Sequence, residues 1–129
     1  MGFTIHTTDD GRALPWEYLP AGAITPKIGL ALTLSAGTLT VASGKPDYIC
    51  MTQADAAVTS GTIIPVVKVQ PDVIWETTLS ASGTSLKQGN AVTLASDGLR
   101  VTATTTSGVF TLTEIVDPAS GGIVRGRFL

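Results

Sequence analysis

The chain repeats part of its own sequence, with a stretch of apolar and small residues recurring 60 positions further on. The segment 27–34 recurs as 87–94, Leu39 and Val41 recur as Leu99 and Val101, and 60–64 recurs as 120–124. A repeat constrains the architecture strongly, because each copy is expected to fold into the same kind of unit. The constant spacing predicts two pseudo-repeated halves, residues 27–69 and 87–129, joined by a connector at 70–86 and preceded by residues 1–26.

From residue 28 onward the pattern is typical of β-strands. Apolar residues alternate with small or polar ones over 29–34 and 38–42, with a glycine turn between them, which predicts a hairpin. The second copy repeats this pattern around Asp97-Gly98, a dipeptide that supplies the positive φ of tight turns. Further strands are predicted over 48–51, 62–69, 73–79, 109–116 and 123–128, whereas 53–60 is a loop or a helical turn.

Many short strands, glycine-rich turns and almost no helical periodicity predict an all-β fold. The two related halves favour a small antiparallel β-barrel, because closure would also remove exposed strand edges. A sandwich stays open as the alternative, since periodicity alone does not separate the two. The length of 129 residues indicates a single β domain, residues 27–129, behind the N-terminal segment.

Residues 1–26 predict an extended N-terminal arm. Proline restricts the residue before it to extended geometry, and the aromatic segment here lies between two prolines. Its apolar side chains need a cover, either the arm's own barrel or another chain, and Trp and Tyr are typical of contact hot spots. The candidate partner-binding residues are Pro15, Trp16, Tyr18, Leu19 and Pro20.

The sequence contains no pattern that predicts catalysis, a metal site or a cofactor site. His6 is the only histidine and Cys50 the only cysteine, which is too few for a zinc site. The carboxylates are dispersed, and the glycines fall singly at turns without a nucleotide-binding motif. We therefore expect no enzyme. The alternative to a structural role is a small carbohydrate- or peptide-binding module that uses Trp16 or Trp75 as a stacking platform.

Charge is sparse and scattered along the chain. Charged residues make up 14%, with a net charge of −2, and the basic residues form no cluster of the kind that binds nucleic acid. No apolar stretch approaches the roughly 20 residues of a membrane-spanning helix, and the N-terminus lacks the pattern of a secretory signal. We expect neither a nucleic-acid nor a membrane partner, and synthesis in the cytoplasm.

The segment 18–34, followed by Gly37-Thr38-Leu39, resembles the opening of small head-decoration or head-fibre-type proteins of tailed bacteriophages and prophages. Residues 87–94 and 123–128 are similar to the same family in style. The resemblance implies a structural protein of the virion that binds the major capsid protein on the outer surface of the head and stabilises the shell. It also implies a homo-oligomer, with a trimer favoured, and no catalytic residue.

Overall fold

The computed structural model describes residues 2–129, which form an all-β fold without a helix, as predicted. The ten strands are β1 (Thr4–Thr8), β2 (Trp16–Ala21), β3 (Ala31–Ser35), β4 (Thr38–Val41), β5 (Tyr48–Cys50), β6 (Thr62–Lys68), β7 (Val73–Thr78), β8 (Ala91–Val92), β9 (Phe110–Ile115) and β10 (Ile123–Phe128). Across the described part of the chain there is accordingly no helix of the length and apolarity that a membrane span requires.

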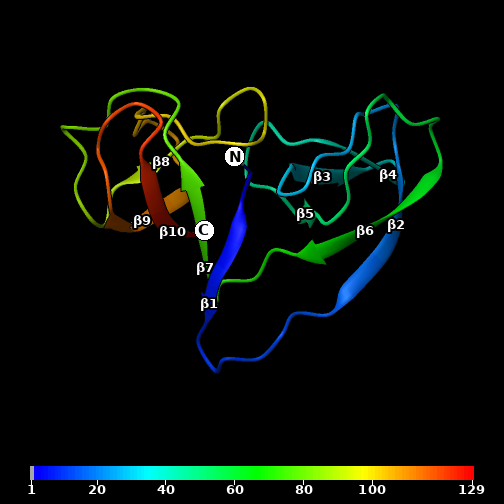
Figure 1. Cartoon of the computed structure of the whole chain (residues 1–129), viewed down its shortest axis with the longest axis horizontal. Helices are drawn as coiled ribbons and strands as arrows, with labels where there is room; N and C mark the ends of the chain where they lie inside the picture. Colours follow the sequence, from blue (N-terminus) through cyan, green and yellow to red (C-terminus); the bar gives the residue numbers. More distant parts are fainter. Residues whose placement is uncertain (1) are drawn as a thin grey trace.

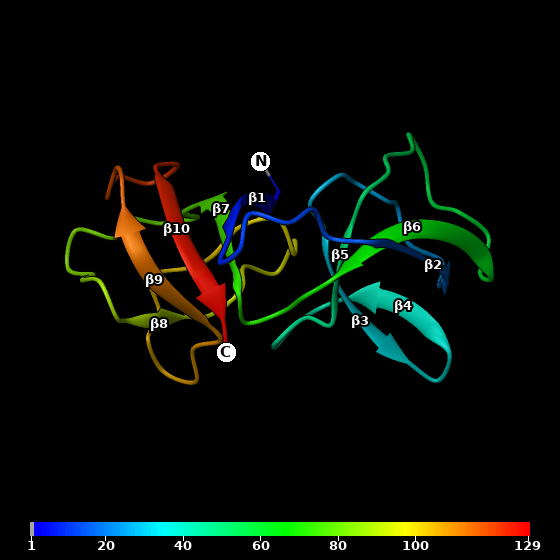
Figure 2. The same ribbon diagram turned by 90° about the horizontal axis from the view of Figure 1, so that it is seen from below.

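The strands form two lobes that lie side by side (Figures 1 and 2). In the first lobe, β2, β4, β3, β5 and β6 close into a barrel, which agrees with the barrel prediction. In the second, the five-stranded sheet has the order β1-β7-β10-β9-β8. Neighbouring strands are antiparallel except β2 and β4, which meet in parallel at Ala21 and Leu39.

Corresponding backbone hydrogen bonds recur in the two lobes. The N–H of Gly29 donates to the carbonyl of Cys50 at 2.8 Å, and that of Gly89 donates to Leu112 at 2.8 Å. Four more N–H to C=O hydrogen bonds of the first lobe have a counterpart in the second, and in each pair of names below the N–H donor comes first. They are Leu30–Lys27 and its counterpart Asn90–Lys87, Cys50–Leu30 and Leu112–Asn90, Gly22–Leu39 and Ser80–Val101, and Gly61–Ala21 and Gly121–Leu79. The parallel contact of Ala21 with Leu39 likewise matches the bridge between Leu79 and Val101. In this correspondence β7 occupies the position of β2, and β10 the position of β6.

The predicted halves, 27–69 and 87–129, are not confirmed with those boundaries. Each lobe uses a strand from outside them, because β2 comes from the predicted arm and β7 from the predicted connector, 70–86. An extended arm over 1–26 is not confirmed either, because two strands of the sheets lie within it. β1 pairs with β7, and every residue of β2 pairs with a residue of β6.

The spacing between the copies is also less uniform than the sequence indicated. Leu39 corresponds to Val101 rather than to Leu99, because the second turn is longer. In the first lobe the turn lies between paired residues Leu34 and Leu39, whereas in the second it lies between Leu94 and Val101.

Two buried clusters hold the molecule together. The smaller one fills the barrel and includes Leu32, Leu39 and Cys50. The larger one joins the lobes, because Ile49 and Val67 of the barrel belong to it together with residues of the second sheet. Within it Phe3, Phe110, Phe128 and Trp75 form an aromatic group, with the rings of Phe110 and Phe128 5.0 Å apart. Strand β5 and the Val67 end of β6 thus contribute to both clusters, with one face toward the barrel interior and the other toward the second lobe, whereas the outer face of β6 at Ile63 is exposed.

Candidate functional site

An exposed apolar surface lies on the outer face of β2 and β6, and we call it the β2–β6 surface. Its members are Trp16, Tyr18, Pro20, Ile63 and Pro65. Trp16, Tyr18 and Pro20 share one face of β2, because alternate residues of a strand point the same way. Tyr18 is paired with Pro65 and Pro20 with Ile63, so these partners add their side chains to the same face.

Three large side chains of the β2–β6 surface are more than half exposed. The exposed fraction is 53% for Trp16, 64% for Tyr18 and 57% for Ile63. Single exposed apolar residues are normal on a protein, whereas adjacent ones across two paired strands mark an interaction surface. The arrangement favours contact with another macromolecule.

The residues named from the sequence fall on two faces of β2. Trp16, Tyr18 and Pro20 lie on the β2–β6 surface, and Pro15 is exposed just before the strand begins. Leu19 points the other way and packs against the barrel's interior cluster. Sequence reasoning missed Ile63 and Pro65. Positions 63 and 65 on the outer face and the buried positions 64 and 66 are all apolar, so no alternation in the sequence distinguishes them.

In the second lobe, the corresponding face is charged and internally paired. Glu76 and Arg125 occupy the positions of Tyr18 and Pro65. Arg125 Nε donates to Glu76 at 2.9 Å, and its guanidinium also donates to Glu114 at 2.9 Å. These hydrogen bonds, from Glu76 first, raise the pKa of Arg125. His6 Nδ1 lies 3.8 Å from Glu76. Partners within the chain therefore pair the charges of this face, whereas no segment of residues 2–129 covers the β2–β6 surface.

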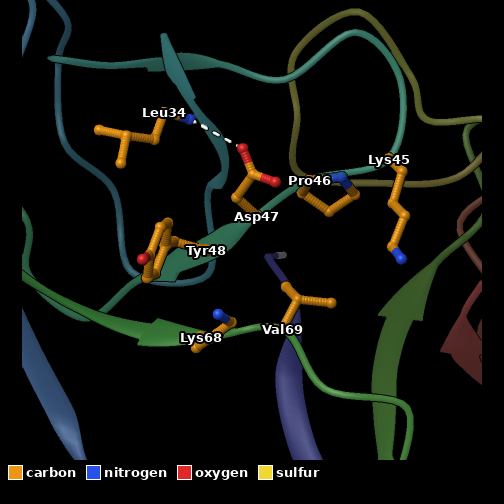
Figure 3. Close-up of a pocket in the computed structure, with 7 residues that line it drawn as sticks. All are labelled: Leu34, Lys45, Pro46, Asp47, Tyr48, Lys68 and Val69. Carbon is orange, nitrogen blue, oxygen red and sulfur yellow. Dashed lines mark hydrogen bonds between the residues drawn. The ribbon is translucent and has the colours of Figure 1, made fainter. Parts of the chain in front are cut away.

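A pocket of about 390 Å³ lies at the end of β5 and β6 (Figure 3). Its lining residues are Leu34, Lys45, Pro46, Asp47, Tyr48, Lys68 and Val69. The Asp47 carboxylate accepts a hydrogen bond from the Leu34 N–H at 3.0 Å, so it fastens the loop to β3. Burial, and then the charges of Glu17 and Asp47, raise the pKa of Tyr48. Two lysines and one backbone-bound carboxylate thus line the pocket, and the structure shows no ion pair between them.

The potentially reactive side chains lie apart from one another. Cys50 is buried in the barrel, its thiol donates to the Thr52 carbonyl at 3.3 Å, and burial raises its pKa. His6 lies on β1, beside Glu76. Among residues 2–129, no group of three or more His, Cys, Asp or Glu side chains is placed to hold a metal ion.

The two tryptophans have opposite environments. Trp75 is fully buried in the aromatic group of the larger cluster, so it cannot serve as a stacking platform. Trp16 is exposed beside Tyr18 on β2. Any aromatic recognition of a ligand by a tryptophan therefore falls to Trp16.

Neither the protein-family models nor the curated protein sequences contain a match to this chain.

Proposed function

We propose that this chain is a structural protein of a tailed-phage or prophage head, which binds the outer surface of the capsid and stabilises the shell. The β2–β6 surface is the contact that it offers to the major capsid protein. The proposal places the protein in the virion and assigns it no catalytic step.

The observation that carries the proposal is the apolar β2–β6 surface, with Trp16, Tyr18 and Ile63 exposed on one face of two paired strands. Burial of aromatic side chains of this size dominates the energetics of protein interfaces. The sequence resemblance to head-decoration and head-fibre-type proteins supplies the capsid as the partner. A contact of standard size, about 1,600 Å², repeated over a shell would stiffen it cumulatively.

Co-sedimentation with shells assembled from the major capsid protein of the same gene cluster tests the proposal. We expect the wild-type chain to pellet with shells, and the double variant Trp16→Ser, Tyr18→Ser to bind at least about 100-fold more weakly, since hot-spot side chains contribute 2 kcal/mol or more each. The matched control is Ile28→Ser, Val116→Ser, two residues of similar exposure outside the β2–β6 surface. Equal binding by both variants, or none by the wild type, would refute the proposal.

We further propose a homo-oligomer, with a trimer favoured by the same resemblance. Light scattering of the isolated protein measures this directly. A mass of about three chains of 13.2 kDa supports the trimer, and the mass of one chain contradicts any homo-oligomer in solution.

A carbohydrate- or peptide-binding module is the second candidate, and one observation favours it. Trp16 and Tyr18 share an exposed face of β2, which resembles a two-ring stacking platform. Because Trp75 is buried, a change of tryptophan fluorescence on adding a glycan or peptide would report on Trp16. Saturable quenching that disappears in Trp16→Phe supports this candidate, and the absence of quenching across a panel argues against it.

A further inference from the structure

Strand β2 has an open edge. On one side it pairs with β6 from Trp16 to Ala21. On the other side, among the described residues, a strand partner is present only at Ala21, which meets Leu39 of β4. The edge from Trp16 to Leu19 therefore lacks a neighbouring strand among the described residues, although the rest of the barrel is closed.

The backbone groups on this edge can be assigned from the hydrogen bonds at the end of the strand. The carbonyl of Ala21 accepts from the Gly61 N–H on the β6 side, whereas the N–H of Gly22 donates to Leu39 on the β4 side. Backbone groups alternate between the two sides of a strand. Trp16 and Tyr18 therefore direct their N–H and C=O groups to the open side. The parallel pairing of Ala21 with Leu39 places the Pro20 carbonyl beside Leu39, in the way that its counterpart Thr78 accepts from the Val101 N–H at 3.1 Å.

The second lobe has a strand at the corresponding edge. There β7 occupies the position of β2, with Glu76 in the place of Tyr18 and Ile74 in the place of Trp16. β1 pairs with β7 in antiparallel orientation, with Thr4 opposite Glu76 and Thr7 opposite Ile74. The chain thus covers one of its two matching edges with an extended segment and leaves the other uncovered.

We propose that an extended segment of the capsid protein adds to the open edge of β2 as an antiparallel strand, in the manner that β1 adds to β7. This inference rests on the proposed function, and it specifies how the β2–β6 surface is used. Main-chain hydrogen bonds to Trp16 and Tyr18 would supply affinity and direction, and the side chains beside them would supply selectivity.

Charge determines the kind of segment that fits. The five side chains of the β2–β6 surface carry no charge, and a charged group laid over them would lose water without gaining a partner. On the side that faces Trp16 and Tyr18, the added strand therefore carries apolar or hydroxyl side chains.

Hydrogen exchange on the full chain, alone and bound to capsid shells, tests the inference. We expect the amides of Trp16 and Tyr18 to exchange at least about tenfold more slowly in the complex. The amides of Glu17 and Leu19, which face β6, serve as internal standards and should change little. Binding without protection of Trp16 and Tyr18 would overturn strand addition while leaving the proposed function intact. Absence of binding would overturn the proposed function itself.

A pair of variants separates the backbone from the side chain. Tyr18→Ala and Tyr18→Pro both remove the ring, but only proline removes the N–H that faces the open edge. A hydrogen-bonding partner left unsatisfied costs 1–3 kcal/mol, so we expect Tyr18→Pro to bind shells about tenfold more weakly than Tyr18→Ala. Equal binding by the two folded variants would overturn the inference.

The same measurements detect a different occupant. Protection of the Trp16 and Tyr18 amides in the isolated protein, lost on dilution, would assign the edge to a second copy of this chain and overturn the capsid segment. If Tyr18→Pro failed to fold, the exchange experiment on the wild-type chain would still decide the question, because it needs no variant.

Discussion

Gly29 and Gly89 occupy matching positions in the two lobes and adopt the same left-handed backbone, with φ of +88° and +90°. Gly29 donates its N–H to the carbonyl of Cys50 on β5, and Gly89 donates its N–H to the carbonyl of Leu112 on β9. Their surroundings differ, however. A Cβ on Gly29 would lie 2.6 Å from the Phe3 nitrogen, whereas a Cβ on Gly89 would meet nothing within 4 Å. Alanine at Gly89 would therefore meet only the strain of a left-handed backbone, whereas alanine at Gly29 would meet the same strain and steric crowding as well.

We predict that Gly89→Ala costs about 1–2 kcal/mol, the penalty for a left-handed alanine. Gly29→Ala should cost about 1–3 kcal/mol more, because the backbone at Gly2 and Phe3 must shift to admit the methyl group. Urea denaturation of both variants measures the difference. Equal costs would show that the N-terminal segment moves away freely.

The Asp97 carboxylate is expected to make the stability of the second lobe depend on pH. Its carboxylate accepts from the Leu99 N–H at 2.9 Å and from Arg100 at 2.9 Å. Burial alone would raise the pKa of Asp97, but these hydrogen bonds outweigh it and lower the pKa below 3.8. A carboxyl whose pKa is lower in the folded state stabilises the protein above its unfolded pKa, and this contribution is lost as the pH falls through the folded value.

Asp97→Asn should therefore be less stable than wild type at pH 7, by less than about 1 kcal/mol because the group is partly exposed. The difference should shrink as the pH falls below the unfolded pKa of about 3.9 and through the lowered pKa of folded Asp97. Denaturant midpoints of the two proteins at pH 7 and pH 3 provide the check. A difference that is constant with pH would contradict the role of the Asp97 charge.

At the scale of strands, the two matching edges differ in their tolerance of proline. Glu76 of β7 is paired with Thr4, and by the alternation of the ladder its N–H faces β1. The N–H of Tyr18 faces no strand. Pro20, on the same edge of β2, is already present in the sequence, which fits the confinement of proline to strand edges.

We predict that Glu76→Pro destabilises the protein by about 1–3 kcal/mol through the loss of a ladder hydrogen bond. Tyr18→Pro should cost the isolated protein less than Glu76→Pro, because no ladder hydrogen bond is lost at the β2 edge. Thermal unfolding of both variants, with Glu76→Ala as the control for lost side-chain contacts to Arg125, measures the contrast. A comparable loss in both proline variants would mean that the β2 edge is not open in solution.

The strand-level predictions succeeded where apolar and polar residues alternate or β-branched residues cluster. The hairpin of β3 and β4 was predicted because Leu32 and Leu34 alternate with smaller polar residues, although only Leu32 of the two is buried. The strand predicted over 73–79 is β7, in which alternate residues are buried. β1 was missed, because its residues Thr4–Thr7 are exposed and carry no such alternation. Pairing with β7 and the buried Phe3 beside it hold this strand in place, and neither is a local property of the sequence.

The prolines explain the misplacement of β2. Pro15 and Pro20 indicated a segment outside the sheets, whereas an open edge accepts proline without losing a ladder bond. Of the β2–β6 surface, the sequence analysis named only the members on β2, which are Trp16, Tyr18 and Pro20. Ile63 and Pro65 could not be added, because the pairing that brings them beside β2 joins residues far apart in the chain.

At the scale of the whole molecule, the two lobes share one apolar cluster. Ile49 lies on β5 of the barrel but belongs to the same buried cluster as Trp75 and Phe128. A shared core of this kind is expected to unfold cooperatively, since neither lobe can separate without exposing it.

We predict that Ile49→Ala costs about 2–5 kcal/mol, the usual range for a buried isoleucine. The loss should also be visible in the other lobe. Fluorescence of buried Trp75 and far-UV circular dichroism should report one common midpoint in both the wild type and the variant. Two separate transitions would show that the lobes unfold independently.

The burial of Cys50 gives the protein an internal reporter of barrel opening. An alkylating reagent reacts with the thiolate form of cysteine. The Cys50 thiol is buried, and burial raises its pKa, so the folded protein presents little thiolate to the reagent. Its labelling rate should therefore follow the fraction of molecules in which the barrel has transiently opened. If the proposed binding to a capsid shell holds β2 more tightly against its neighbours, the rate of Cys50 labelling should fall in the bound protein.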